Sequence, residues 1–415
     1  MENKSAMILK KRWARGLLFI FMIFGWKGIQ AQNNSDRALK AYYSFDDCDA
    51  HDNTGNNSHG ILESVQCQCG ASGESLFFNG KESHVEFEGN VNNYFRANHF
   101  TVSFYFRPAT SSPNTVLMSK MGCEDNIGWI MRYGGNGSIA VQLMGNNDVE
   151  NKLNVKLKNN TCWTHLALVR KGSAIELYEN GELIGTDDNE LRPANIEAKS
   201  KLRLGKGHCS SSLDRPFRGN IDELRIYNEP LDALQIRRLM LSVDQIMTQD
   251  TVVARGDSFI PSMSSTCSAD VEWSPSHAVS DPEILKPVIT VDETTTLEIR
   301  YNYGSCVATD QLQVRVVDSD EIDCESIPMA RAFTPNDDGL NDTYGITIPG
   351  AFDRLISFEI FNQWGERIFQ TDQVDDPWDG TFKGQKMNPG GFLYKIRYEC
   401  RNQEFVKTGE FLLLN

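Results

Sequence analysis

Apolar and polar side chains alternate over short stretches through most of this 415-residue chain, and this period of two constrains its fold more than any other feature. Successive side chains of a β-strand point to opposite sides, so alternation predicts strands with one buried face. The clearest such face is formed by Phe100, Val102, Phe104 and Phe106. Asn180-Gly181, between two further alternating stretches, is typical of a tight hairpin. Many short strands in about 200 residues predict a β-sandwich.

The length exceeds one ordinary domain, and changes in pattern divide the chain into several segments. We assign 1–31 to a targeting segment, 35–241 to a large β unit, 243–319 to a smaller one, and 324–415 to a C-terminal β unit. The first segment has basic residues, then an apolar run at 16–26, then the sequence Ile29-Gln-Ala-Gln32. This order predicts a secretory signal peptide cleaved near Ala31. The apolar run falls short of the roughly 20 residues that span a bilayer, so we expect no transmembrane segment after cleavage.

The charge of the chain excludes some classes of partner. Residues 1–31 hold six basic and one acidic side chain, so the remainder has 35 basic and 55 acidic groups and a net charge of about −20. Such a surface repels phosphate backbones and anionic lipid. We therefore expect no nucleic-acid partner.

All ten cysteines follow residue 31, and an even number in an exported chain predicts disulfides. Within the second β unit, a bond between Cys267 and Cys306 would contribute about 4 kcal/mol on the loop-entropy model. Cys324 and Cys400 bracket the C-terminal unit and are positioned to join its first strand to a late one. The six cysteines of the large unit allow fifteen connectivities, so their spacing alone does not settle the pairs.

The C-terminal unit carries four blocks: AFTPNDDGLND at 332–342, FNQWGE at 361–366, WDG at 378–380, and Tyr394. In this order they resemble the gliding-motility-associated C-terminal domain, a type B sorting domain read by type IX secretion. The resemblance implies an antiparallel β-sandwich whose folded shape the type IX secretion machinery recognises. It assigns a sorting role to Phe333, Pro335, Asn336, Gly339, Asn341, Asp342, Trp364, Gly365, Trp378 and Gly380. The tryptophans and glycines among them are interpreted as turn and core residues.

The large unit carries six blocks in a second recognisable order. They are AYYSFD at 41–46, DNTGNNSHG at 52–60, LFFNG at 76–80, WTHLALVR at 163–170, LYENG at 177–181 and GNIDELRIYN at 219–228. Together they resemble the laminin-G-like, concanavalin A-like jelly roll. The spacing of Cys267, Trp273 and Cys306 resembles, more loosely, the immunoglobulin-like spacers of secreted bacterial proteins. The expected fold is therefore all-β: a jelly roll, an immunoglobulin-like spacer and a small C-terminal sandwich.

The jelly-roll resemblance also implies a metal site and disulfide pairs. The family often binds structural calcium between the loop after the first strand and the start of the last strand, which selects Asp52, Asn57 and Asp222. Related modules imply a bond between Cys123 and Cys209. Cys48 is then expected to pair with Cys67 or Cys69, Cys67 being taken first, and Cys162 with the one that remains.

A second calcium candidate lies in the sorting motif. Asn336, Asp338 and Asp342 carry oxygen ligands around the turn at Gly339. The sixth-position glycine and the terminal glutamate of an EF-hand are missing, which favours a hydrogen-bonded turn instead.

Enzyme activity finds little support in these patterns. Glucanases on the concanavalin A-like sandwich need two carboxylates on one face, about 5 to 5.5 Å apart for retention. Asp222 and Glu223 are adjacent on a strand and are expected to point to opposite faces. No Gly-x-Ser-x-Gly or His-Glu-x-x-His pattern occurs. Trp163 and His165 are interpreted as sandwich core rather than as a site.

The expected function is recognition outside the cell. We predict a protein that is secreted or held at the outer cell surface and binds a glycan or glycoprotein through the jelly roll without catalysis. This step rests on analogy between folds, because the same sandwich carries unrelated functions. One alternative is an adhesive or structural surface protein for attachment or gliding; another is a polysaccharide hydrolase or its accessory subunit.

Overall fold

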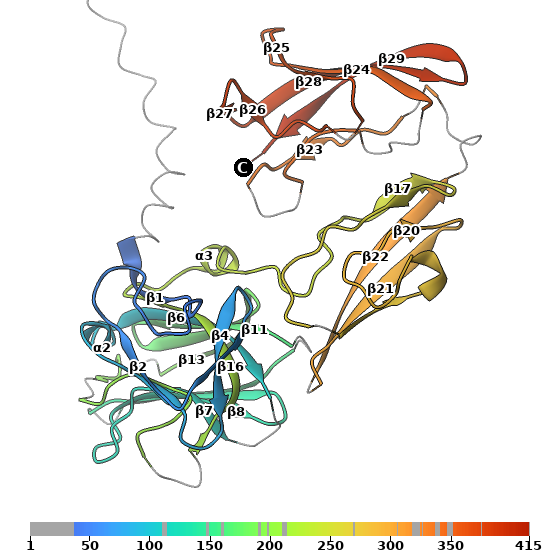
Figure 1. Cartoon of the computed structure of the whole chain (residues 1–415). Helices are drawn as coiled ribbons and strands as arrows, with labels where there is room; N and C mark the ends of the chain where they lie inside the picture. Colours follow the sequence, from blue (N-terminus) through green and yellow to red (C-terminus); the bar gives the residue numbers. More distant parts are fainter. Residues whose placement is uncertain are drawn as a thin grey trace, which may run out of the picture.

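The computed structural model describes residues 37–414, with gaps at 110–113, 147–148, 159–161, 190–191, 197–198, 210–213, 269, 305, 318–323, 326, 337–340, 347–351 and 375. The predicted signal peptide at 1–31 lies outside the described residues. The all-β prediction is confirmed, since strands dominate each of three successive units (Figure 1). Among the described residues, no helix has both the length and the apolar character needed to cross a bilayer.

The first unit is a sandwich of two eight-stranded sheets. One sheet runs β13 (Glu182–Asp188), β12 (Ala174–Glu179), β11 (Thr164–Lys171), β6 (His99–Pro108), β16 (Arg218–Tyr227), β4 (Glu74–Asn79) and β3 (Gln66–Cys69), with β1 (Leu39–Tyr43) paired to β16. The other runs β10 (Glu150–Lys156), β9 (Ser138–Met144), β8 (Gly128–Gly134), β7 (Thr115–Ser119), β14 (Arg203–Leu204), β5 (His84–Phe87) and β2 (Gly60–Glu63), with β15 (Arg215–Pro216) on β7. The first and last strands, β1 and β16, are antiparallel neighbours.

The core of this sandwich lies between the two sheets, as the alternation of apolar and polar residues predicted. The phenylalanines at 100, 104 and 106 are fully buried there with Leu166 and Leu168 of β11. The opposite side of β6 is buried as well, because the chain after β16 returns across that sheet. Its short helix α3 (Ala233–Arg237) begins with a capping box formed by Asp232 and Gln235. A second short helix, α2 (Val91–Tyr94), follows β5.

This second, outer layer corrects the expectation for Trp163 and His165. Both are buried, but they lie on the outer side of the sheet, whereas Leu166 and Leu168 lie inside the sandwich. Trp163 packs with Tyr105 and Ala71 beneath the chain around Leu241 and Val243. Alternation identified the shared face but could not show that a later segment covers it.

The second unit is built on a four-stranded sheet with a tryptophan at its centre. The sheet runs β17 (Thr251–Ala254), β22 (Val307–Val317), β21 (Thr295–Asn302) and β19 (Asp270–Ser274). A two-stranded sheet, β18 (Ser258–Phe259) with β20 (Ile289–Thr290), and a 3-10 turn η1 (Ser276–Ala278) accompany it. Trp273 is buried and donates from its indole nitrogen to the Ile284 carbonyl at 3.1 Å.

The third unit is a five-stranded sheet with a short hairpin. The sheet runs β23 (Ala332–Phe333), β29 (Gln403–Leu413), β28 (Gly390–Cys400), β24 (Arg354–Phe361) and β25 (Arg367–Thr371); the hairpin is β26 (Thr381–Phe382) with β27 (Gln385–Lys386). One pair departs from the antiparallel expectation, because β23 runs parallel to β29. Trp378 lies at the centre of the core, 5.4 Å from the Phe333 ring and 5.2 Å from the Phe392 ring between centroids.

Five disulfides stabilise the chain, and three match the pairs expected from the sequence. Cys48 is bonded to Cys67, Cys123 to Cys209, and Cys324 to Cys400. The prediction of a bond between Cys267 and Cys306 is wrong. Cys267 is bonded to Cys69, and Cys306 to Cys162, so the expectation that Cys162 pairs within the large unit is also wrong.

The physical reason lies at one end of the second sheet. Asp270 of β19 pairs with Asn302 of β21, so Cys267, just before β19, and Cys306, just after the β21 end, emerge at the same edge. That edge faces the first unit, whose Cys69 and Cys162 meet them. Two cross-links therefore join the first two units.

Candidate functional site

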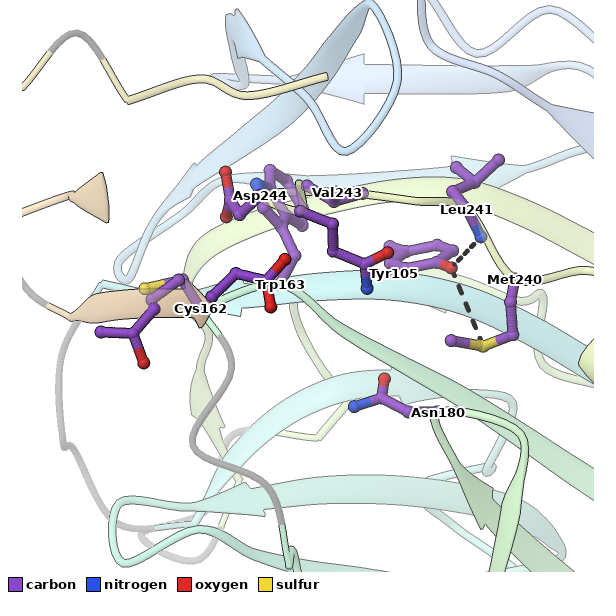
Figure 2. A pocket seen from close by; sticks show the side chains of 12 residues that line it. Tyr105, Cys162, Trp163, Asn180, Met240, Leu241, Val243 and Asp244 are labelled. Atoms are coloured by element: carbon purple, nitrogen blue, oxygen red, sulfur yellow. Dashed lines mark hydrogen bonds between the residues drawn. The ribbon is translucent and has the colours of Figure 1, made fainter. Parts of the chain in front are cut away.

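A cleft with a volume of about 380 Å³ lies where the first unit meets the second (Figure 2). Its walls come from β6, the two residues just before β11, the β12–β13 turn, the segment joining the two units, and β22. The lining residues are Tyr105, Cys162, Trp163, Asn180, Met240, Leu241, Val243, Asp244, Gln245, Ala308, Thr309 and Asp310. The Cys162–Cys306 bond lies at this cleft, so its two sides are held together covalently.

The floor of the cleft is apolar and tightly attached to the joining segment. The Tyr105 hydroxyl accepts a hydrogen bond from the Leu241 amide at 2.6 Å and donates one to the Met240 sulfur, as Figure 2 shows. Burial raises the pKa of Tyr105, so this hydroxyl stays protonated. The joining segment is thereby fixed against the sheet rather than left as a loose linker.

A stack of side chains extends this contact across the two units. The Arg107 guanidinium lies 5.3 Å from the centroid of the Trp163 ring and 4.5 Å from that of Tyr303 in the second unit. Arg107 also donates to the Asn220 side chain at 3.0 Å. Burial lowers the pKa of Arg107, and cation–π contacts of this kind gain strength when they are desolvated.

The polar wall of the cleft contains two carboxylates, each engaged with its surroundings. Asp244 is buried and accepts from the Tyr303 hydroxyl at 2.7 Å, while burial raises its pKa. Asp310 accepts from the Ile246 amide at 2.7 Å and from the Gln311 amide at 2.9 Å. Each carboxylate therefore already accepts at least one hydrogen bond from the protein itself. Hydroxyl-bearing ligands remain the class suited to the amide, hydroxyl and carboxylate groups around the rim.

No role was predicted for the lining residues of the joining segment. The chain near residue 242 was expected to be a domain boundary. The available signal was the apolar character of Leu241 and Val243, because an exposed linker is ordinarily polar. Apolar side chains at such a boundary indicate packing between neighbouring units.

One constellation that resembles catalytic machinery is buried beside this cleft. The Ser103 hydroxyl lies 2.7 Å from Nε2 of His165, and both residues are fully buried. Burial, with a smaller contribution from Arg225, lowers the pKa of His165 to about 3. Nδ1 of His165 has no hydrogen-bond partner among the described residues, whereas a triad requires an acidic partner there. The pair is therefore a packed polar contact rather than a nucleophile with its base.

The side chains of the adjacent acidic residues Asp222 and Glu223 are also buried. Glu223 has a φ of +55° at an irregularity in the β16 pairing, so simple alternation fails there. Asp222 accepts from the Ser72 amide at 3.1 Å, and burial raises its pKa to about 8. Glu223 pairs with Arg225 and accepts from the Tyr42 hydroxyl at 3.0 Å.

The predicted calcium residues of the first unit occupy separate hydrogen-bond networks. Asp52 is buried and accepts from the backbone and hydroxyl of Thr54, at 3.0 and 2.7 Å, and from the Ser58 amide at 3.3 Å. Asn57 has a φ of +54° in the same loop. Asp222 instead accepts from the loop that contains Ser72. Among the described residues, no three His, Cys, Asp or Glu gather as metal ligands. Calcium here stays a prediction.

The sorting-motif residues serve different parts of the third unit. Phe333 and Trp378 are in the core, and a Cβ at Gly380 would lie 2.9 Å from Pro335. The Thr334 amide donates to the Asn341 carbonyl at 2.8 Å. Asp338 and Gly339 lie outside the described residues, so the second calcium candidate with Asn336 and Asp342 also stays a prediction.

The two tryptophans of the motif divide between the expected turn and core roles, and Trp364 has no part in the core. Its side chain is 84% exposed, whereas Trp378 is 1% exposed. Trp364 lies with Gly365 in the turn between β24 and β25, where Gly365 has a φ of +78°. The hairpin tip carries the indole away from the sheet, which the local sequence did not indicate.

Two family matches agree with the units seen in the fold. Residues 79–237 match the concanavalin A-like lectin/glucanases superfamily. Residues 327–413 match the type IX secretion signal domain. Both resemblances inferred from the sequence are thereby confirmed. A secretion signal domain of this type places the chain among proteins that are secreted or located at the outer cell surface.

Individual proteins are similar over parts of the chain. The non-toxic nonhemagglutinin type D of Clostridium botulinum D phage is 23% identical over 177 residues, which are 42% of this chain and 14% of that protein. The chain thus spans about one seventh of that relative. Domain 4 of the extracellular arabinanase AbnA of Geobacillus stearothermophilus, solved with arabinotriose, is 25% identical with a TM-score of 0.38, covering 48% of this chain and 97% of that one. The binding domain of botulinum neurotoxin DC, solved with SialylT, is 14% identical with a TM-score of 0.41, covering 66% and 73%.

Proposed function

We propose that this chain, which joins a concanavalin A-like unit to a type IX secretion signal domain, is an exported recognition protein that binds a glycan or glycoprotein without catalysis. The observation that carries the proposal is the lectin/glucanase family match over residues 79–237 together with the export signal at 327–413. The type IX secretion machinery is the partner for delivery, and the saccharide is the partner at the destination.

The cleft between the first two units is the proposed binding site. Its rim offers the Gln245 amide, the Thr309 hydroxyl and the Asp310 carboxylate, and Met240 and Leu241 supply apolar surface. A small number of polar groups beside apolar surface at a domain interface is the usual composition of a ligand site. Two disulfides hold the interface, so little ordering cost opposes binding.

Binding is favoured over hydrolysis by the state of the acidic residues on the sheet. Retaining glycosidases present two carboxylates to the substrate about 5 to 5.5 Å apart. Asp222 and Glu223 are both buried and hydrogen-bonded within the fold. A saccharide cannot reach them without disrupting the sheet.

The first experiment is a broad saccharide array probed with the purified mature chain, with and without a chelator. We expect binding to a restricted group of saccharides. No binding to any saccharide would contradict the proposal and favour the adhesive alternative. Release of shortened products from a bound saccharide would instead support a hydrolase.

Variants then test the position of the site. Gln245→Ala combined with Thr309→Ala should weaken binding at least tenfold, because both polar groups are removed from the rim. Gln313→Ala combined with Thr296→Ala is the matched control, since both residues are exposed on the same sheet outside the cleft. Equal affinity in the two double variants would exclude the cleft.

Export is tested separately by deleting residues 324–415. The truncated chain should accumulate inside the cell envelope. Normal surface delivery of the truncated chain would contradict the export role, whatever the array shows.

A further inference from the structure

Trp364 is unusual among the tryptophans that the structure describes. The other four, at 129, 163, 273 and 378, are at most 4% exposed, whereas Trp364 is 84% exposed. Tryptophan is a residue that folded proteins generally bury. An indole left in water at such a position gains nothing for the fold.

The hairpin tip holds this indole in a defined place. Oδ1 of Asn362 accepts from the Trp364 and Glu366 amides, both at 3.0 Å. The backbone carbonyl of Asn362 accepts from the Gly365 amide at 2.9 Å. The backbone amide of Asn362 donates to the Glu366 carbonyl at 3.0 Å. These hydrogen bonds hold the backbone of the turn in one conformation, so that binding a partner would carry little cost for ordering the turn.

A second hairpin lies beside this tip. The Lys383 amine, from the turn between β26 and β27, is 3.7 Å from a carboxylate oxygen of Glu366. The Lys383 amine also lies 4.4 Å from the centroid of the Phe382 ring. The two-hairpin tip, defined as Trp364, Glu366 and Lys383, therefore presents one large aromatic group beside exposed charges of both signs. This pattern of an aromatic anchor with a polar surround is typical of protein–protein contact sites.

The unit itself does not use this surface. Its core is built by residues such as Phe333, Trp378 and Phe411, and Trp364 is not among them. The match to a type IX secretion signal domain supplies a reason for a contact surface in this unit, because a signal must be bound to be read.

We propose that Trp364 is the anchor through which the two-hairpin tip docks on a protein of the type IX secretion machinery, in an apolar pocket on that protein. This rests on the export role proposed above. The indole enters the pocket, and the Glu366–Lys383 pair stays at the rim, where exposed ion pairs contribute little affinity.

The test is export of the full chain in a bacterium that has type IX secretion. Trp364→Ala should lower the exported fraction, measured by immunoblot, about tenfold or more, and Trp364→Phe should retain part of it. Leu412→Ala is the matched control, because Leu412 is an apolar residue of the same unit that is 50% exposed. It should be exported normally. Purified Trp364→Ala should melt at the wild-type temperature, which separates docking from folding.

Each outcome has a distinct meaning. Normal export of Trp364→Ala, when deletion of 324–415 blocks export, overturns the role of Trp364 and leaves the signal domain intact. Normal export of both overturns the export role itself. Normal export of Trp364→Ala with reduced saccharide binding would assign the indole to a ligand instead, and this also overturns the inference.

Discussion

Cys69, on the edge strand β3 of the first unit, is bonded to Cys267 of the second unit, 198 residues further along the chain. The Cys162–Cys306 bond joins the same two units across a separation of 144 residues. The cleft, the stack of Arg107 between Trp163 and Tyr303, and these bonds lie along one interface. The first two units are therefore joined covalently into one body, although each is built on its own sheets.

Removing these two bonds should separate the two units. We expect a variant with Ser at Cys69, Cys162, Cys267 and Cys306 to show a larger radius of gyration in solution scattering and new proteolysis near residue 242. On the chain-entropy model each cross-link over so long a loop contributes about 5 kcal/mol when taken alone. Replacing Cys123 and Cys209 with Ser, within the first unit, should lower the melting temperature without changing the radius of gyration. An unchanged radius of gyration in both variants would contradict the conclusion that these two disulfides hold the first two units together.

His165 should make the fold sensitive to acid. Its folded pKa of about 3 lies below the value of about 6.5 for an unfolded histidine, so the neutral form is favoured in the fold. The resulting stability is present above about pH 6.5 and is lost as pH falls toward 3, by at most about 1.4 kcal/mol per pH unit. His165→Gln cannot be charged, so its melting temperature should fall less between pH 7 and pH 4. His277→Gln, at an exposed site, should follow the wild type; parallel curves for all three proteins would refute this role.

The two tryptophans of the C-terminal motif should differ in stability effect. Trp378 is buried, and its indole nitrogen donates to the Thr381 carbonyl at 2.7 Å. Trp378→Ala should cost about 3 to 5 kcal/mol, through a cavity and a lost hydrogen bond, and unfold the unit at moderate temperature. Trp364→Ala should change stability by less than about 0.5 kcal/mol. Chemical denaturation monitored by circular dichroism measures both, and equal costs would contradict the assignment of Trp378 to the core.

Calcium binding in the first unit can be measured directly. If the loop with Asp52 and Asn57 binds the ion, adding calcium should raise the melting temperature, because an ion bound only to the native state stabilises it by RT ln(1 + [L]/Kd). At about a hundredfold excess over Kd this amounts to about 2.7 kcal/mol. Magnesium at the same concentration is the control, since it demands smaller, near-octahedral sites. A melting temperature that responds to neither calcium nor a chelator would count against the site.

Local chemistry accounts for the parts of the fold that the sequence predicted. The alternation at Phe100, Phe104 and Phe106 led to a buried face of β6, because strand geometry relates residue spacing to direction without reference to any partner. Asn180-Gly181 formed the predicted turn between β12 and β13 for the same local reason. Cys324 and Cys400 were assigned by their places at the two ends of one unit.

Short-range patterns and ordered motifs were therefore enough to predict the all-β class, the order of the units and the export signal. The remaining features depend on contacts between residues that are distant along the chain. Cys267 met Cys69 because two sheet edges from different units face each other, and no spacing along the chain encodes that distance. Trp364 and Trp378 look alike as Trp followed by a turn, yet one is in water and the other in the core, because burial depends on which distant side chains cover a position. The cleft arises from that same meeting of distant surfaces.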